Sequence, residues 1–235
     1  MKRIAVLVSG GGTNLQALID AQRREGWQEG ALCAVISSSP GAYALKRAEQ
    51  AGIPAYVVSR RDYPSSQAMT HALTGLLQEL EIDLVVLAGF LYVLTEEIIR
   101  AFPNAIINVH PALIPSFCGE GAYGLHVHEQ ALAYGVKLSG ATVHFVNEDC
   151  DGGPIILQKA VEVLEGDTPQ TLQKRIMEQA SGSSCPGPCA CSVRDGCRWR
   201  ADGCGSSARR NPAHASALIV HKKPLLTIHH SEVLI

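Results

Sequence analysis

The residues best suited to chemistry in this sequence are an amide and an imidazole two positions apart, Asn108 and His110. They end an apolar, β-branched run that begins at Ile106, and residues two apart in a strand point to the same face. Pro111 and Pro115 follow, and the strand must stop there because proline fixes φ and lacks an N–H. An amide donor beside an ionisable ring suits a carbonyl that becomes an oxyanion. A strand end with two polar turn residues would look the same, so the pair needs support from elsewhere.

A loop rich in acids lies further along the chain, over Asn147–Pro154. It follows an alternating run, Gly140–Val146, which predicts a strand with Thr142 and His144 on one face. An acid brought close to His110 would favour the charged imidazolium and orient the ring. Acidic loops are often only solvated turns, so spacing alone does not select an acid in this loop.

A glycine-rich loop, Ser9–Asn14, follows the first apolar run and opens a helical pattern. Glycine lets the backbone approach an anion, and a helix N-terminus offers free N–H groups, so a phosphate fits there. The loop is neither G-x-G-x-x-G nor a Walker loop, and the second apolar run ends in Ser37–Pro40 without a ribose-binding acid. A single phosphate on a smaller ligand is therefore favoured over a dinucleotide, and a tight turn without a ligand remains the alternative.

Apolar runs alternate with helical patterns through the first 180 residues. The predicted strands are Arg3–Val8, Cys33–Ser37, Ala55–Val58, Leu84–Leu87, Ala105–Val109, Gly140–Val146 and Ile155–Val163. The predicted helices are Asn14–Arg24, Ala42–Ala51, Gln67–Glu81, Glu96–Ala101, His126–Tyr134 and one that Thr168 caps and that runs from Pro169 to Ala180. This alternation predicts an α/β, Rossmann-like fold, in which a mostly parallel twisted sheet carries helices on both faces. Ligands in such sheets bind at the carboxyl ends of the strands.

Composition narrows the class of protein. The 235 residues are 46% hydrophobic and 18% charged, with a formal net charge of −2, which fits one globular domain with or without an appendage. No apolar run is long enough to cross a membrane, and the N-terminal run from Met1 to Ser9 reads as a strand rather than a signal peptide. We therefore expect a cytoplasmic protein with no membrane partner. The first 180 residues hold no basic stripe, so we expect no nucleic-acid partner either.

Taken together, these segments resemble one family, phosphoribosylglycinamide formyltransferase, the folate-dependent transformylase of purine synthesis. The matching segments stand in the family's order and spacing and are Ser9–Gln16, Ala88–Phe90, Asn108–Pro115, Gly124–His128 and His144–Pro154. Each segment alone is weakly specific, whereas the combination is highly specific.

The resemblance implies transfer of a formyl group from 10-formyltetrahydrofolate to the amine of glycinamide ribonucleotide, with both as small-molecule substrates and no metal. It implies three sets of site residues. The catalytic set is Asn108, His110 and Asp151, and the residues at the ribonucleotide phosphate are Gly12, Thr13 and Asn14. The folate-binding set is Leu91, Tyr92, Val93, Leu94, Asn108, Asn147, Glu148, Asp149, Cys150 and Asp151. His144 would support the site from its strand, and Ser66 stands where many members carry a basic residue.

Two alternatives remain at this point. Formyltetrahydrofolate deformylase and methionyl-tRNA formyltransferase resemble the same Asn/His/Asp core, but the first would need an extra domain before Arg3 and the second a β-barrel after the catalytic domain. A chain of another class, a nucleotide-binding module without catalysis, would not need three catalytic positions on separate strand ends.

The composition changes abruptly after residue 180, which predicts a formyltransferase domain over residues 1–180 and an irregular tail over 181–235. Five of the 8 cysteines lie between Cys185 and Cys204, but their spacing lacks paired C-x₂-C knuckles, so we expect no zinc site. Codons for Ser181–Cys191, read one base earlier, can encode an amphipathic helix that resembles the family's usual ending. We therefore expect the tail to be an aberrant, frameshifted and disordered C-terminus that weakens solubility and activity, and sequencing the gene across the codons for Ala180 and Ser181 tests this.

Overall fold

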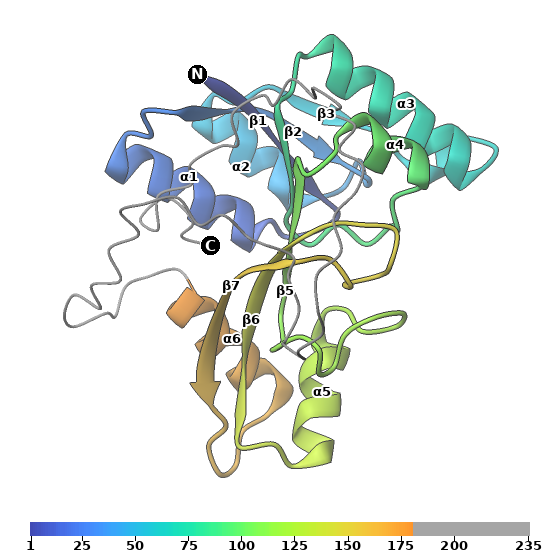
Figure 1. Cartoon of the computed structure of the whole chain (residues 1–235). Helices are drawn as coiled ribbons and strands as arrows, with labels where there is room; N and C mark the ends of the chain where they lie inside the picture. Colours follow the sequence, from blue (N-terminus) through green and yellow to red (C-terminus); the bar gives the residue numbers. More distant parts are fainter. Residues whose placement is uncertain (181–235) are drawn as a thin grey trace, which may run out of the picture. The chain divides into compact units, whose positions relative to one another are not determined.

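A single mixed sheet organises the part of the chain that the structure, a computed structural model, describes, which is residues 1–180. Within those residues the strands are β1 (Lys2–Val8), β2 (Gly30–Ser37), β3 (Ala55–Val57), β4 (Leu84–Leu87), β5 (Ile106–His110), β6 (Leu138–Phe145) and β7 (Ile155–Glu162). Their order across the sheet is β3-β2-β1-β4-β5-β6-β7 (Figure 1). The strands from β3 to β5 are parallel, whereas β6 runs antiparallel to both β5 and β7. The prediction of a mostly parallel sheet is confirmed.

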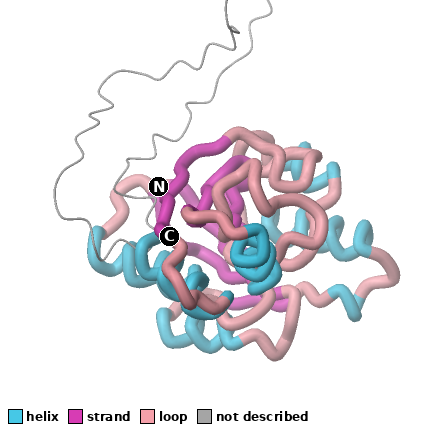
Figure 2. Tube along the Cα trace, turned by 90° about the horizontal axis from the view of Figure 1, so that it is seen from below, coloured by secondary structure: helices cyan, strands magenta, loops and turns pink. Residues whose placement is uncertain are grey.

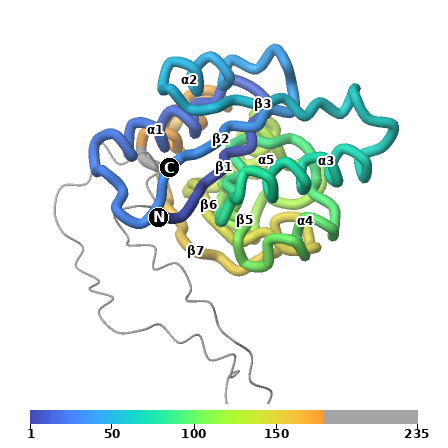
Figure 3. The backbone as a smooth tube through the Cα atoms, turned by 90° about the horizontal axis from the view of Figure 1, so that it is seen from above, coloured from blue at the N-terminus to red at the C-terminus, as the bar shows by residue number. Residues whose placement is uncertain are grey.

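Helices cover both faces of this sheet. They are α1 (Thr13–Glu25), α2 (Tyr43–Ala51), α3 (Ser66–Glu79), α4 (Glu96–Ala101), α5 (Leu125–Tyr134) and α6 (Pro169–Ala180), with a short 3₁₀ helix at Arg60–Asp62. The α1 and α2 helices lie on one side of the strands, and α3 and α4 lie on the other (Figure 3). The strands run through the centre of this arrangement, with helices around them (Figure 2). None of the helices in residues 1–180 is both long and apolar enough for a membrane span.

Strand β1 explains why both faces must be covered. Its side chains alternate between two cores: Val6 packs in the cluster that α1 and α2 contribute to, and Leu7 packs in the cluster that α3 and α4 contribute to. Both side chains are fully buried. A strand covered on both faces reads as a continuous apolar run, and this is the pattern seen at the N-terminus of the sequence.

The predicted element boundaries differ from the observed ones by a few residues. Strand β2 begins at Gly30, earlier than predicted, because Lys2 of β1 pairs with Gly30. Strand β5 extends to His110, which pairs with Thr142 of β6, so the imidazole belongs to the strand and not to the following turn. The short helix at Arg60–Asp62 was not predicted. The predicted domain boundary at residue 180 and the predictions for the tail lie outside the described residues.

The point at which the chain reverses its progress across the sheet lies between β1 and β4. The chain moves outward from β1 through β2 to β3, and then returns to place β4 on the other side of β1. Such a reversal opens a crevice at the carboxyl ends of the two strands. The loops that leave β1 and β4 begin at Ser9 and Ala88, so the sheet topology predicts a ligand between them.

An ion pair links α6 to the loop that follows β7. The guanidinium of Arg175 reaches Asp167 with both terminal nitrogens, at 2.6 and 2.7 Å, and also donates to the carbonyl of Glu162. Asp167 accepts further hydrogen bonds from the N–H of Leu164 and the hydroxyl of Thr171. The hydrogen bond from Arg175 is the main reason why the pKa of Asp167 lies well below its usual range.

Replacing Asp167 with Asn is expected to lower the free energy of unfolding by about 1–3 kcal/mol at neutral pH, since charged hydrogen bonds contribute that much. Because the pKa is lowered in the folded state, this stabilisation is present above the usual carboxyl value and fades as the pH falls below about 4. Urea unfolding at pH 7 and at pH 3 measures it, with Glu165→Gln in the same exposed loop as the control. Equal stability of wild type and Asp167→Asn at pH 7 would contradict this role.

Candidate functional site

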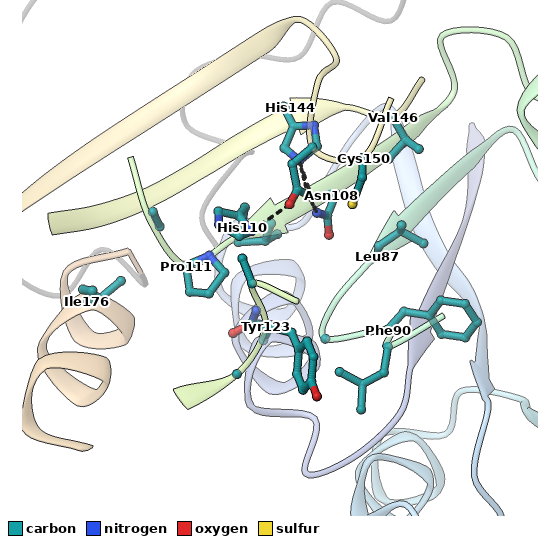
Figure 4. Close-up of a pocket in the computed structure, with 18 of the residues that line it drawn as sticks. Leu87, Phe90, Asn108, His110, Pro111, Tyr123, His144, Val146, Cys150 and Ile176 are labelled. Carbon is teal, nitrogen blue, oxygen red and sulfur yellow. Dashed lines mark hydrogen bonds and ion pairs between the residues drawn. The ribbon is translucent and has the colours of Figure 1, made fainter. Parts of the chain in front are cut away.

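A cavity of about 1090 Å³ opens at the carboxyl edge of the sheet. Figure 4 shows its wall, with Asn108 and His110 from β5 facing His144 from β6. Its lining comes from the start of α1, the loops after β4, β5 and β6, and part of α6. The predicted site residues in the lining are Thr13, Asn14, Leu91, Tyr92, Val93, Leu94, Asn108, His110, Asn147, Glu148, Asp149, Cys150 and Asp151. Gly12 is the one predicted site residue that does not line it.

The carboxylate of Asp151 lies at the centre of the polar wall. Its Oδ1 accepts a hydrogen bond from Asn108 Nδ2 at 3.3 Å, and its Oδ2 lies 3.5 Å from His110 Nδ1. The same Oδ2 accepts the backbone N–H of Gly119 at 2.9 Å. His144 Nε2 lies 3.5 Å from Oδ1. The structure therefore brings together all three residues of the predicted catalytic set.

The surroundings of Asp151 favour its charged form. Burial would raise the pKa of this carboxyl, but a hydrogen bond from His144, the N–H of Gly119 and the charges of His110 and His144 outweigh it and lower the pKa. His110 is almost fully buried, and its Nε2 donates to the carbonyl of Phe117 at 2.8 Å. Each ring nitrogen of His110 thus faces an oxygen, one from the backbone and one from a carboxylate.

The β5–β6 pairing sets the position of Asn108. Asn108 is directly opposite His144 in the register, and its Nδ2 lies 3.2 Å from His144 Nε2. The other ring nitrogen of His144 donates to the carbonyl of Phe145 at 2.9 Å, which fixes the orientation of the ring. His144 therefore contacts two members of the predicted catalytic set, Asn108 and Asp151, from the neighbouring strand.

The loop that carries Asp151 is held by close backbone packing. Asp151 has φ 55°, and Gly152 and Gly153 follow it. A Cβ atom added to Gly153 would lie 1.8 Å from the carbonyl oxygen of Phe145, and one added to Gly152 would lie 2.6 Å from Cβ of Asp149. Neither position leaves room for a side chain, so these two glycines allow the loop to close against β6.

The glycine-rich loop leads into α1, and the N-terminus of this helix is suited to binding an anion. No side chain caps α1, so the N–H groups of its first turn, at Thr13 and Asn14, have no intrahelical partner. Gly12 has φ 70°, and a Cβ there would lie 2.6 Å from Cβ of Ala44 in α2. The sequence predicted that Gly12 lets a ligand approach, whereas the structure shows that it also lets the loop pack on α2.

The family resemblance implies that the ribonucleotide phosphate binds at this loop, so replacing Gly12 with Val is expected to raise KM for the ribonucleotide by about tenfold or more, since a side chain in this left-handed region costs on the order of 1–2 kcal/mol and also displaces the loop. The folate KM should change much less, because the residues that the resemblance assigns to the folate lie in other loops. Steady-state kinetics with each substrate varied in turn measures this. Gly10→Ala is the matched control, since a Cβ at Gly10 meets nothing within 4 Å. An equal rise of both KM values would mean general damage to the fold.

Apolar side chains form the opposite wall of the cavity. Leu91, Tyr92 and Val93 are 62%, 38% and 75% exposed, whereas Leu94 is buried in the core beneath them. The ring of Tyr92 contacts the ring of Phe90, with their centroids 5.9 Å apart. Exposed apolar side chains of this kind suit a flat aromatic ligand.

Sequence reasoning did not predict several residues of the cavity wall, and two of these bring an ionisable side chain to the site. Arg47 of α2 donates to the carbonyl of Gly11 at 2.9 Å and to the side chain of Gln16 at 3.0 Å, so it brings a positive charge to the glycine-rich loop. His128 of α5 is fully buried, and neither of its ring nitrogens has a hydrogen-bond partner within the described residues. Burial, together with the charge of His110, lowers the pKa of His128 to about 4. Nothing in the sequence indicates that an arginine on a helix lies beside the glycine-rich loop. His128, in contrast, belongs to Gly124–His128, one of the segments that resemble the family.

Ser66 occupies a position at which many family members carry a basic residue, and the structure shows what surrounds it. Ser66 is the first residue of α3, and its hydroxyl accepts a hydrogen bond from Nε of Arg60 at 3.3 Å. A guanidinium therefore lies beside the position at which many family members carry a basic residue.

Comparison with known proteins defines the class. A family model described as formyl transferase matches residues 2–184. The chain belongs to the formyl transferase family.

Individual relatives within this family are similar to the chain over most of residues 1–180. The chain is 41% identical over 179 residues to phosphoribosylglycinamide formyltransferase of Haemophilus influenzae, covering 76% of this chain and 82% of that protein. It is 46% identical over 176 residues to the trifunctional purine biosynthetic protein adenosine-3 of Drosophila melanogaster, which covers 74% of this chain but only 13% of that protein. The chain thus spans a small part of the trifunctional relatives.

A solved structure agrees with these sequences. The crystal structure of glycinamide ribonucleotide transformylase 1 from Symbiobacterium toebii has a TM-score of 0.71 and 48% identity, and the match covers 76% of this chain and 82% of that one. The resemblance to phosphoribosylglycinamide formyltransferase is confirmed, and the deformylase alternative is not favoured.

Proposed function

We propose that this chain transfers the formyl group of 10-formyltetrahydrofolate to the amine of glycinamide ribonucleotide, a step of purine synthesis. The observation that carries the proposal is the contact of one carboxylate, Asp151, with both Asn108 and His110 at the wall of a single large cavity. The names of the relatives support the choice of substrates, and residues 1–180 form the proposed catalytic domain.

The two substrates would occupy different ends of the cavity. The ribonucleotide phosphate would bind at Thr13 and Asn14, whose N–H groups have no partner within the helix, and Arg47 adds a positive charge nearby. The folate ring would bind against Leu91–Leu94 and the loop Asn147–Asp151, which line the other side. The formyl group would then lie between them, next to the β5 side chains.

The chemistry follows from these positions. The amine of the ribonucleotide attacks the formyl carbon, a C–N bond forms, and the carbonyl oxygen becomes an oxyanion. Asn108 and protonated His110 stabilise that oxyanion, for which the N–H at Nε2 of His110 exchanges its hydrogen bond to the carbonyl of Phe117. The charge of Asp151, at Nδ1, stabilises the protonated imidazole and holds its ring. His110 donates its proton to N10 as the bond to the folate breaks. A water molecule takes the proton from the attacking amine and passes it to His110, which restores the imidazolium, and tetrahydrofolate leaves.

The proposal also covers partners and location. Both partners are small molecules, and no metal, nucleic acid or membrane takes part. The acidic excess of residues 1–180 supports the absence of a nucleic-acid partner, and we place the activity in the cytoplasm.

A two-part assay of the full 235-residue chain tests the proposal. With both substrates and no added metal, we expect tetrahydrofolate to form only when glycinamide ribonucleotide is present, with one formyl group transferred per folate released. Release of free formate without the ribonucleotide would point to a deformylase. Binding of the ribonucleotide without any turnover would point to a non-catalytic module.

A further inference from the structure

The side chain of Ser9 joins three loops at the carboxyl edge of the sheet. Ser9 directly follows β1 and precedes the glycine-rich loop. Its Oγ lies 2.6 Å from Oγ of Ser38, in the loop after β2, and accepts the N–H of Leu91 at 3.0 Å, in the loop after β4. The predicted site did not include Ser9 or Ser38, and the mechanism above does not use them.

A serine hydroxyl has one proton and two lone pairs, and this arrangement uses them consistently. Ser9 accepts the N–H of Leu91, so its own proton is free for the short contact with Ser38. Ser38 is itself fixed, because it is 4% exposed and its N–H donates to the carbonyl of Val8 at 3.0 Å. The Ser9 hydroxyl is therefore anchored on the rigid side of the crevice.

The loop after β4 depends on this contact. Within the described residues, the hydrogen bond from Leu91 to Ser9 is the only one recorded for the segment from Gly89 to Leu94. Leu91 and Val93 are mostly exposed, so burial does little to hold this part of the loop. A segment with few buried contacts and few hydrogen bonds opens locally at low free-energy cost.

We infer that Ser9 is a positioning residue for the folate, because it fixes the backbone of Leu91 relative to the glycine-rich loop. The inference rests on the proposed function, in which the folate ring packs on Leu91–Leu94 and the ribonucleotide phosphate binds beside Thr13. Ser9 thereby sets the spacing between the two substrates, although its own side chain touches neither. An error in that spacing affects the approach of the amine to the formyl carbon.

The test combines kinetics and direct folate binding, both with the full chain. For Ser9→Ala, we expect KM for 10-formyltetrahydrofolate and the Kd of tetrahydrofolate to rise about five- to tenfold, the usual effect of losing one hydrogen bond. The ribonucleotide KM should change less than about twofold, and kcat should fall only modestly, because the catalytic set is untouched. Ser9→Thr retains the hydroxyl and should restore most of the folate affinity.

Ser38→Ala is the matched control, since it removes the neighbouring hydroxyl but leaves the acceptor for Leu91. Its folate affinity should stay near that of wild type. Unchanged folate affinity in Ser9→Ala, or equal losses for both substrates, would overturn the role of Ser9 while leaving the proposed function intact. If wild-type chain bound no folate at all, the proposed function and the inference would both fail.

Discussion

Replacing Asp151 with Asn is expected to lower kcat by about two orders of magnitude or more, the usual effect of losing acid–base and charge stabilisation together. The amide keeps the size of the carboxylate, but its one oxygen can accept from Gly119 or from Asn108 and not from both, and it carries no charge to stabilise the imidazolium of His110. Both KM values should change little, because the lost interaction acts in the transition state. Initial rates at saturating concentrations of both substrates measure the effect.

Two features make this substitution a clean test. Asp151 has φ 55°, a conformation that Asn adopts more readily than most residues, so the turn should survive. Glu165→Gln is the control, since it removes an exposed charge that lies outside the cavity lining. The pKa of Asp151 is lowered, so its carboxylate should stay charged throughout the neutral pH range. Titration of Asp151 should therefore not change wild-type activity near neutral pH. Near-normal turnover of Asp151→Asn would remove the residue from the mechanism.

Replacing His110 with Ala is expected to lower kcat by about a hundredfold or more, because the variant loses both an oxyanion donor and the acid for N10. His110 lies in the cavity wall, so water can fill the space that the ring leaves, but a water molecule there supplies no fixed positive charge. Single-turnover rates with both substrates bound would separate the chemical step from product release.

His71→Ala is the control for His110→Ala, since His71 is an exposed histidine of α3 that pairs with Glu97 away from the cavity. Circular dichroism of both variants should match wild type. Thermal unfolding of His71→Ala should also match it, whereas His110→Ala loses a buried, hydrogen-bonded ring and is expected to unfold at a lower temperature. A His110→Ala variant that turns over within tenfold of wild type would contradict its role as the acid.

The sequence predicted most of the sheet because buried parallel strands have a local signature, a short apolar run between helical patterns. Asn108 and His110 were also found locally, because two residues in one strand need no knowledge of the rest of the fold. Asp151 could be chosen only through the family resemblance. Its contact with His110 depends on the β5–β6 register and on a turn whose course cannot be read from its acids.

The residues that sequence reasoning missed share a physical reason. Ser9 and Arg47 act through contacts with segments that are distant in the chain, at Leu91 and Gly11. Serine and arginine are common in loops and on helix surfaces, so residue type carries little information about such contacts. Only the assembled sheet edge brings these loops together.

The tight packing of Gly152 and Gly153 has a consequence for how this site can vary. The acid is held in place by two residues that have no functional groups, while Glu148 and Cys150 in the same loop take no part in that packing and line the cavity. Substitutions at these two positions can therefore retune ligand preference without moving the catalytic carboxylate. Substitutions of Gly152 or Gly153 would abolish activity although neither residue has a reactive side chain. A mutational scan that measures activity should therefore find that this loop tolerates substitutions in its first part and not at the two glycines.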